Sequence, residues 1–292
     1  MLITPDVPNL PSRVQGNVRY FELVAQPVKR EILRNVFYKG WGYNGSIPGP
    51  TILVYPGEWV SIRVHNRLDE DTTIHWHGLD IPNSMDGVSE VEPTPRIKPG
   101  SYFDYRFQVI NPPGTHMYHT HFNVAKQEMM GLSGGFIILD PNDKMNRDYF
   151  VMLSEFKLKG LKEGELQPGV YEIDPLSHEF NFFTMNGRSF PNTTPLVTCQ
   201  GEKVRIRLAN SGRDAHPIHI HGHQFLVTAS DGNSLSSPLL KNTVLVASGE
   251  TWDIEFDSYN PGTWPFHCHI PHHNSNNLTK GIGGMFTTIK YI

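Results

Sequence analysis

The stretch GEWVSIRVHN at residues 57–66 recurs 144 positions later as GEKVRIRLAN at residues 201–210. In both copies apolar and polar residues alternate, which is the two-residue period of a strand with one buried face. Similar short runs, such as YFDYRFQV at residues 102–109, are separated by the turn-forming residues glycine and proline, which number 26 and 23. The pattern predicts an all-β chain of two tandem Greek-key sandwich or barrel domains.

The repeat also predicts where the domains divide. Residues 140–148 (DPNDKMNRD) are polar and contain a proline between two apolar stretches, which is typical of a linker. We therefore expect a first domain at residues 1–145 and a second at residues 146–292. A length of 292 residues suits two domains, each with its own core.

Composition excludes several classes of partner. Charged residues are 18% of the chain and the net charge is -4, so we expect neither nucleic acid nor an anionic membrane as a partner. No apolar run reaches the roughly 20 residues of a membrane-spanning helix. The opening residues contain no signal-like apolar core, which fits a cytoplasmic protein or a secreted one whose leader has been removed.

Histidine is the unusual residue in this composition, with 15 copies. Eight of them form four His-x-His pairs, and on a strand residues i and i+2 point to the same side, so each pair presents two imidazoles together. One such pair is often only a polar strand face, but four pairs that follow the internal repeat predict bound metal. Because imidazole suits copper and zinc, eight imidazoles predict several such ions. The pairs are His75/His77, His119/His121, His219/His221 and His267/His269.

The second copy has four further ligand types that the first copy lacks. Cys268, His216, His273 and Met285 align in the repeat with Thr120, Thr72, Ala125 and Phe136. Two histidines, one thiolate and a weak axial thioether make the trigonal blue-copper site used for electron transfer.

Strand alternation predicts how the two kinds of site connect. It points Cys268 to one side while His267 and His269 point to the other, so one short segment would join the blue site to the histidine cluster. Cys199 has no nearby histidine and is expected to be an inert thiol.

These motifs, HWHG, YHTH, HPIHIHGH and HCHIPHH, resemble those of the multicopper oxidases in order and spacing, over nearly the whole chain. The chain resembles the two-domain, laccase-like group with type 1 copper in the second domain. The resemblance implies cupredoxin-like domains and four copper ions per subunit, one type 1, one type 2 and two type 3. It assigns type 1 to His216, Cys268, His273 and Met285, and type 2 to His75 and His219. It assigns one type 3 ion to His77, His119 and His269, and the other to His121, His221 and His267.

The resemblance further implies that Cys268 passes electrons, His273 presents its edge to the substrate and Asp86 supplies protons. An Asp-Gly turn is the simpler interpretation of Asp86. In one respect the chain departs from the family, because the usual axial position holds Leu278. We interpret residues 274–281 as a loop insertion that transfers the axial role to Met285.

The function implied is one-electron oxidation of a small reducing substrate, such as a phenol or aromatic amine, coupled to reduction of dioxygen to water. The resemblance also implies a homotrimer with histidine clusters at subunit interfaces, and a secreted or periplasmic location. Alternatives are a metallo-oxidase for cuprous or ferrous ions, a copper nitrite reductase and a non-catalytic copper carrier. A nitrite reductase would carry its cysteine in the first domain, and a carrier would not need eight further imidazoles.

Overall fold

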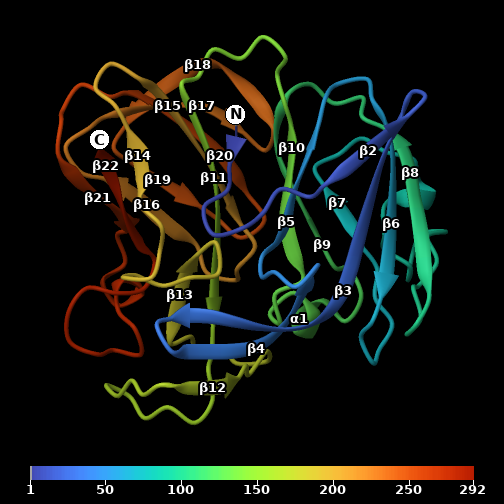
Figure 1. Cartoon of the computed structure of the whole chain (residues 1–292), viewed down its shortest axis with the longest axis horizontal. Helices are drawn as coiled ribbons and strands as arrows, with labels where there is room; N and C mark the ends of the chain where they lie inside the picture. Colours follow the sequence, from blue (N-terminus) through green and yellow to red (C-terminus); the bar gives the residue numbers. More distant parts are fainter. Residues whose placement is uncertain (1) are drawn as a thin grey trace.

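The first part of the chain forms a sandwich of two β-sheets (Figure 1). The computed structural model describes residues 2–292. A six-stranded sheet has the order β12 (Gly169–Glu172), β4 (Val36–Tyr43), β3 (Val18–Leu33), β6 (Trp59–Asn66) and β8 (Tyr102–Gln108), with β2 (Ser12–Gln15) paired to β3. A four-stranded sheet has the order β5 (Gly49–Val54), β10 (Ser133–Ile138), β9 (Gly114–His119) and β7 (His75–His77). Large aromatic side chains, among them Trp76, Tyr105 and Tyr118, fill the core between the sheets.

The second part forms a similar sandwich. Its seven-stranded sheet has the order β1 (Leu2–Ile3), β11 (Arg147–Phe156), β15 (Lys203–Asn210), β20 (Thr251–Asp257), β17 (Phe225–Ser230) and β18 (Asn233–Lys241), with β13 (Phe182–Met185) paired to β11. Its five-stranded sheet has the order β14 (Leu196–Thr198), β22 (Phe286–Tyr291), β21 (Thr263–Cys268), β16 (His216–Ile220) and β19 (Thr243–Val246). Helical segments are short: η1 (Asn83–Met85), α1 (Val124–Gln127) and η2 (Pro271–Asn274).

The repeated motif occupies the same place in both sandwiches. Strand β6 pairs in parallel with β3 and antiparallel with β8, and β15 pairs in the same two ways with β11 and β20. The predicted all-β fold of tandem sandwiches is therefore confirmed. Two strands cross between the halves, since β1 pairs with β11 and β12 pairs with β4. The division at residue 145 stays a prediction.

The two sandwiches share an apolar interface. Met117 and Ile137 from the first half pack with Phe150 and Met152 from the second. A Cβ atom on Gly135 would lie 2.5 Å from the Phe150 ring, so the glycine permits this close approach of β10. The shared core fixes the relative position of the two sandwiches.

A buried polar network crosses the same interface. The Arg207 guanidinium donates to both carboxylate oxygens of Asp148, at 2.8 and 3.0 Å, and lies 3.3 Å from Asp253. Thr115, from the first half, donates to Asp253 at 2.6 Å and accepts from Arg207 at 2.9 Å. The single guanidinium therefore offsets part of the negative charge of two carboxylates that are buried away from water.

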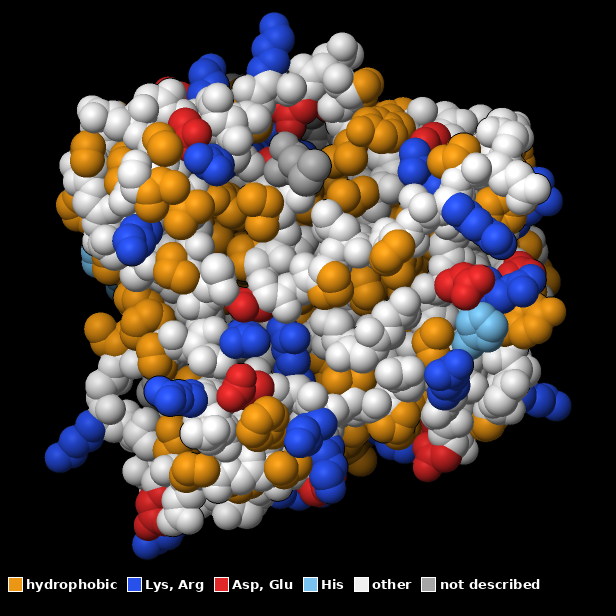
Figure 2. All heavy atoms as spheres, viewed as in Figure 1, with side chains coloured by type: hydrophobic (Ala, Val, Ile, Leu, Met, Phe, Trp, Pro, Cys, Tyr) orange, Lys and Arg blue, Asp and Glu red, His pale blue; other side chains and the backbone are white. Residues whose placement is uncertain are grey.

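The surface carries no dominant charge on the face shown in Figure 2, where lysine and arginine side chains are interspersed with acidic ones. This distribution agrees with the net charge of -4. Among the described residues, no helix is long and apolar enough to cross a membrane.

Candidate metal centre

Cys268, His216 and His273 converge in the core of the second sandwich. The Cys268 Sγ lies 3.5 Å from His273 Nδ1 and 3.9 Å from His216 Nδ1, and the two Nδ1 atoms are 3.2 Å apart. Ligand atoms about 2.0–2.3 Å from a common ion are separated by roughly 3–4 Å, so this trio fits a metal bound by two imidazoles and one thiolate. All three side chains are buried.

Burial shifts the pKa values of Cys268 and His273 in the metal-free protein. It raises the pKa of the Cys268 thiol to about 12 and lowers the pKa of His273 to about 3. The imidazole is thus neutral and ready to bind an ion, whereas the thiol would lose its proton as the metal enters. A thiol in this state is inert without metal.

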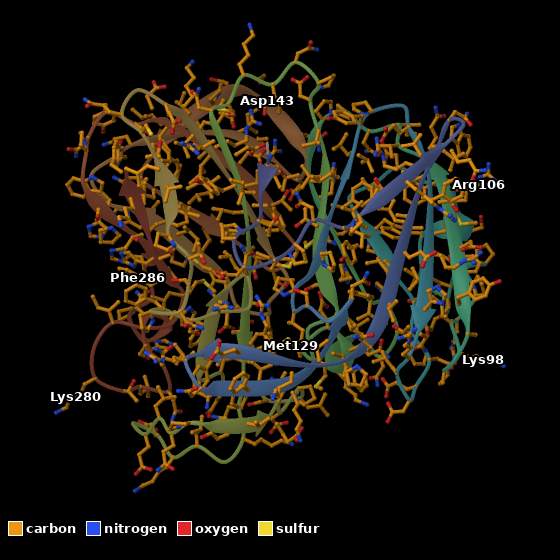
Figure 3. All side chains as sticks on the ribbon, viewed as in Figure 1. Lys98, Arg106, Met129, Asp143, Lys280 and Phe286 are labelled. Carbon is orange, nitrogen blue, oxygen red and sulfur yellow. The ribbon has the colours of Figure 1, made fainter. Side chains whose placement is uncertain are left out.

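The loop after η2 places Met285, and not Leu278, at the trio. Met285 is fully buried, its N–H donates to the His273 carbonyl at 2.8 Å and its carbonyl accepts from the Cys268 N–H at 3.0 Å. Leu278 is 52% exposed. Figure 3 shows the same loop extending outward at Lys280.

His273 is closed off from solvent. Its ring stacks on Phe183 with centroids 3.9 Å apart, and only 2% of the residue is exposed. The predicted substrate-facing edge of His273 is therefore not exposed. The neighbouring His272 is exposed instead and lines, with Phe183 and Leu278, a cavity of about 260 Å³.

The first histidine quartet lies on β7, β9 and the residues just after β9. His75 is directly opposite His119 in the antiparallel pair, and His77 Nδ1 lies 3.2 Å from His119 Nε2. Ligand atoms of these three residues lie within 4.8 Å of one another, as a shared metal site requires. The His121 ring centroid is 5.7 Å from that of His75. Burial lowers the pKa of His119 to about 3 and keeps the ring neutral.

Asp86 holds His75 in one orientation. Its carboxylate lies 3.2 Å and its carbonyl oxygen 3.0 Å from His75 Nδ1. With Nδ1 as the donor, the lone pair on Nε2 is free for a metal. The predicted proximity of Asp86 to the histidine cluster is therefore observed, and its role in proton supply stays a prediction.

The second quartet has the equivalent place in the second sandwich. His219 is opposite His267 in the pairing of β16 with β21, and His221 Nε2 lies 3.1 Å from His267 Nε2. The His269 ring centroid is 5.5 Å from that of His219. His219 Nδ1 donates to the carbonyl of Asn242 at 2.7 Å, which leaves Nε2 for a metal.

The two quartets do not meet within one chain. Among the described residues, ring contacts link their histidines only inside each quartet. Figure 1 shows β7 and β9 toward one end of the long axis and β16 and β21 toward the other. Each chain therefore presents two separate histidine quartets.

Two carboxylates beside these histidines, one buried and one partly exposed, were not predicted from the sequence. Glu155 on β11 lies 3.2 Å from His216, and Glu128 after α1 lies 3.6 Å from His119. Burial, with a smaller contribution from Glu155, raises the pKa of Glu128 to about 7. Neither residue belongs to a histidine motif. The only signal in the sequence for Glu155 was its acidic side chain at a core-facing position of a strand.

Two buried histidines outside the predicted ligand set, His116 and His223, have other surroundings. His223 donates from Nδ1 to the His221 carbonyl at 3.1 Å and accepts from the Tyr291 hydroxyl at 2.7 Å. His116 is buried against Gly232, and its Nε2 has no hydrogen-bond partner among the described residues. That neither residue is a ligand stays a prediction.

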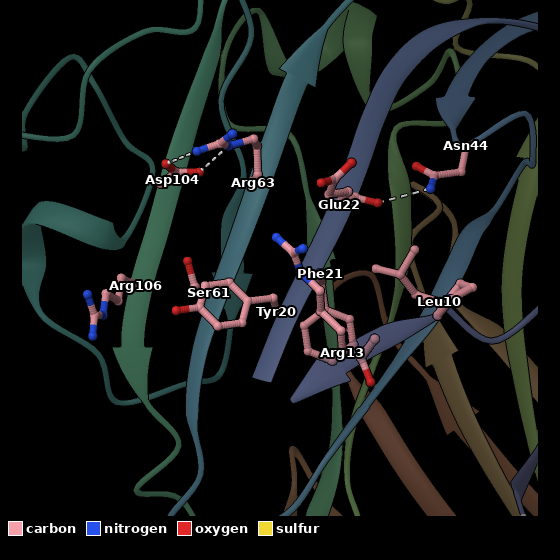
Figure 4. Close-up of a pocket in the computed structure, with 12 residues that line it drawn as sticks. Leu10, Arg13, Tyr20, Phe21, Glu22, Asn44, Ser61, Arg63, Asp104 and Arg106 are labelled. Carbon is pink, nitrogen blue, oxygen red and sulfur yellow. Dashed lines mark hydrogen bonds and ion pairs between the residues drawn. The ribbon is translucent and has the colours of Figure 1, made fainter. Parts of the chain in front are cut away.

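A hollow on the first sandwich lies away from both quartets. It measures about 760 Å³ and opens on the outer face of β3, β6 and β8. Figure 4 shows Arg13, Arg63 and Arg106 around it, with Arg63 held by Asp104 through two hydrogen bonds of 2.7 and 2.8 Å. Without histidine or thiol side chains, this hollow does not offer the ligands of a copper site.

Comparison with known proteins agrees with this geometry. Two family models, both described as multicopper oxidase, match residues 25–143 and 166–281. The structure of a blue copper oxidase from Nitrosomonas europaea is 32% identical, with a TM-score of 0.82 over 93% of this chain and 85% of that one.

Two curated relatives are longer than this chain. Multicopper oxidase mco of Staphylococcus epidermidis is 32% identical over 269 residues, 88% of this chain and 57% of the relative. Copper resistance protein A of Escherichia coli is 29% identical over 258 residues, 72% of this chain and 42% of the relative. The chain thus spans about half the length of the curated relatives it matches.

Proposed function

This chain belongs to the multicopper oxidase family, and from that premise we propose that it is a laccase-type copper oxidoreductase. It would oxidise phenols or aromatic amines one electron at a time and reduce dioxygen to water. The observation that carries the proposal is the buried trio of His216, Cys268 and His273, whose cysteine stands between His267 and His269 of the second quartet.

We assign four coppers per subunit to the residues identified above. Type 1 would be held by His216, Cys268, His273 and Met285, and type 2 by His75 and His219. One type 3 ion would be held by His77, His119 and His269, and the other by His121, His221 and His267. The bound copper would supply one-electron acceptors and the centre at which dioxygen is reduced.

The protein's own residues would perform three tasks. The Cys268 backbone would join the buried trio to the second quartet, because consecutive residues of a strand face opposite sides. Asp86 would orient His75 and deliver protons from its carboxylate oxygen, 3.2 Å from His75 Nδ1. Phe183, stacked on His273, would keep water away from the trio.

A homotrimer is the assembly we propose, with each histidine cluster built from the first half of one subunit and the second half of the next. The separation of the two quartets within one chain supports it. A copper cluster with ligands from both quartets can then form only between two copies of the chain. By family resemblance we also propose a secreted or periplasmic location.

A metallo-oxidase for cuprous or ferrous ions is the second candidate. The likeness to copper resistance protein A favours it. Against it, the nine methionines include only one adjacent pair, Met129-Met130, so the sequence has no methionine-rich segment to collect copper ions.

The deciding experiment combines copper analysis, the visible and near-ultraviolet spectrum, and oxygen uptake with a simple phenol. About four coppers per chain, an intense blue thiolate-to-copper band and oxygen consumption would support the laccase-type proposal. About two coppers, a blue band and no oxygen uptake would overturn it in favour of a carrier or a nitrite-reductase-like protein. Faster oxygen uptake with cuprous or ferrous ions than with phenols would favour the metallo-oxidase.

A further inference from the structure

Glu155 is a fully buried carboxylate beside the candidate blue-copper trio. One of its oxygens, Oε1, accepts hydrogen bonds from the backbone N–H groups of Arg213 and Asp214, the second at 2.9 Å. Its other oxygen, Oε2, lies 3.2 Å from His216 Nε2. Both Glu155 and His216 have a side-chain exposure of 0%, so neither can exchange these partners for water.

This contact fixes which nitrogen of His216 faces the metal site. A carboxylate only accepts hydrogen bonds, so the imidazole must carry its proton on Nε2. The lone pair is then on Nδ1, the atom that faces Cys268 Sγ at 3.9 Å and His273 Nδ1 at 3.2 Å. The metal-binding form of the ring is thereby selected in advance of metal binding.

The second imidazole of the trio lacks an equivalent partner. His273 Nε2 lies 3.8 Å from Asp214, beyond hydrogen-bond distance, and that carboxylate is 41% exposed. His273 is held instead by stacking on Phe183. The direct buried carboxylate contact is therefore specific to His216.

We propose that Glu155 is a positioning residue for the type 1 site, which presets His216 Nδ1 as a ligand and favours the oxidised form of the bound ion. The proposal rests on the function proposed above. Its physical basis is that a carboxylate hydrogen-bonded to a ligating imidazole fixes the ring and increases its basicity. A negative charge in a buried site also stabilises the more highly charged oxidation state.

Glu155→Gln tests both parts of the proposal. The glutamine oxygen is needed as acceptor for the two backbone N–H groups, so its NH₂ group would face His216 Nε2. The ring would then accept at Nε2 and hold its proton on Nδ1, the atom that should bind the metal. We expect cupric binding to weaken about tenfold more than cuprous binding, which raises the type 1 potential by about 59 mV for one electron.

Two measurements separate this role from simple support of the fold. Nitrogen NMR of the metal-free wild-type protein should place the His216 proton on Nε2, and in the variant on Nδ1. A redox titration of the blue band should give the higher potential for Glu155→Gln and an unchanged one for Glu250→Gln. Glu250 is a matched control because it also accepts a backbone N–H, from Ala247 at 3.0 Å, but contacts no candidate ligand.

The outcomes are distinct. A wild-type His216 proton on Nδ1 would overturn the proposal even if the variant did not fold, and so would a potential within about 18 mV, a twofold change, of the wild-type value. A wild-type protein without a blue band would instead overturn the function proposed above, while the NMR result would still report the orientation of His216.

Discussion

Substitution of Arg207 by methionine would remove the cation that contacts both carboxylates of the buried network between the two sandwiches. Arg207 has a side-chain exposure of 4%, and its partners Asp148 and Asp253 have exposures of 5% and 8%. Burial raises the pKa of Asp253, and the attraction of Arg207 opposes that shift. Methionine would fill much of the space but would leave both carboxylates without their closest charge partner.

The expected loss is about 3–5 kcal/mol in the free energy of unfolding, the usual cost of removing one partner of a buried ion pair. Asp148 keeps a weaker partner in Arg205, at 3.6 Å, and Asp253 keeps the hydroxyl of Thr115, at 2.6 Å. We therefore expect the loss to stay within that range, and not to double because two carboxylates are affected. Such a loss is a large fraction of the roughly 5–15 kcal/mol that stabilises a typical folded protein.

Urea unfolding of the metal-free protein measures this cost. Lys39→Met is the control, because the Lys39–Glu172 pair is 59% and 58% exposed and should contribute less than about 1 kcal/mol. Adding Asp148→Asn and Asp253→Asn to Arg207→Met should recover part of the loss, since no buried charge is then left unpaired. If Arg207→Met unfolds at the same urea concentration as Lys39→Met, the network does not stabilise the interface.

Three further changes test the site and its surroundings. Cys268→Ser should abolish the blue band and substrate oxidation while the remaining coppers stay bound, and unchanged visible absorption would contradict the type 1 assignment. Burial lowers the pKa of His116 to about 4, against about 6.5 in an unfolded chain. As the pH falls, His116 therefore takes up a proton in the unfolded state at a higher pH than in the folded state. The free energy of unfolding should fall by up to about 3 kcal/mol as the pH drops from about 6.5 to about 4. His116→Phe should remove this part of the pH dependence in urea unfolding, so parallel profiles for the two proteins would refute it. Gly87→Ala should cost at least about 2 kcal/mol, because Gly87 has a φ of 101° and its added Cβ would lie 1.9 Å from the Ile74 carbonyl oxygen. In Gly57→Ala the added Cβ would have no other atom within 4 Å, so this change should cost less in the same unfolding assay.

The sequence by itself determined the duplicated β-architecture and predicted the ligand sets. Both rest on short-range rules, since alternation along a strand places His75 on the same side as His77. The presence of Cys268 in only one copy of the repeat likewise distinguishes the two halves from the order of residues alone.

Only the tertiary structure decided which distant groups surround those ligands. Glu155 and His216 are 61 positions apart and meet because β11 and β16 pack in one sandwich, a contact that no local pattern encodes. The burial of His273 under Phe183, the location of Met285 at the trio and the separation of the two quartets have the same origin. Strand pairing and core packing bring distant segments together, and these long-range contacts depend on the whole fold rather than on any one motif.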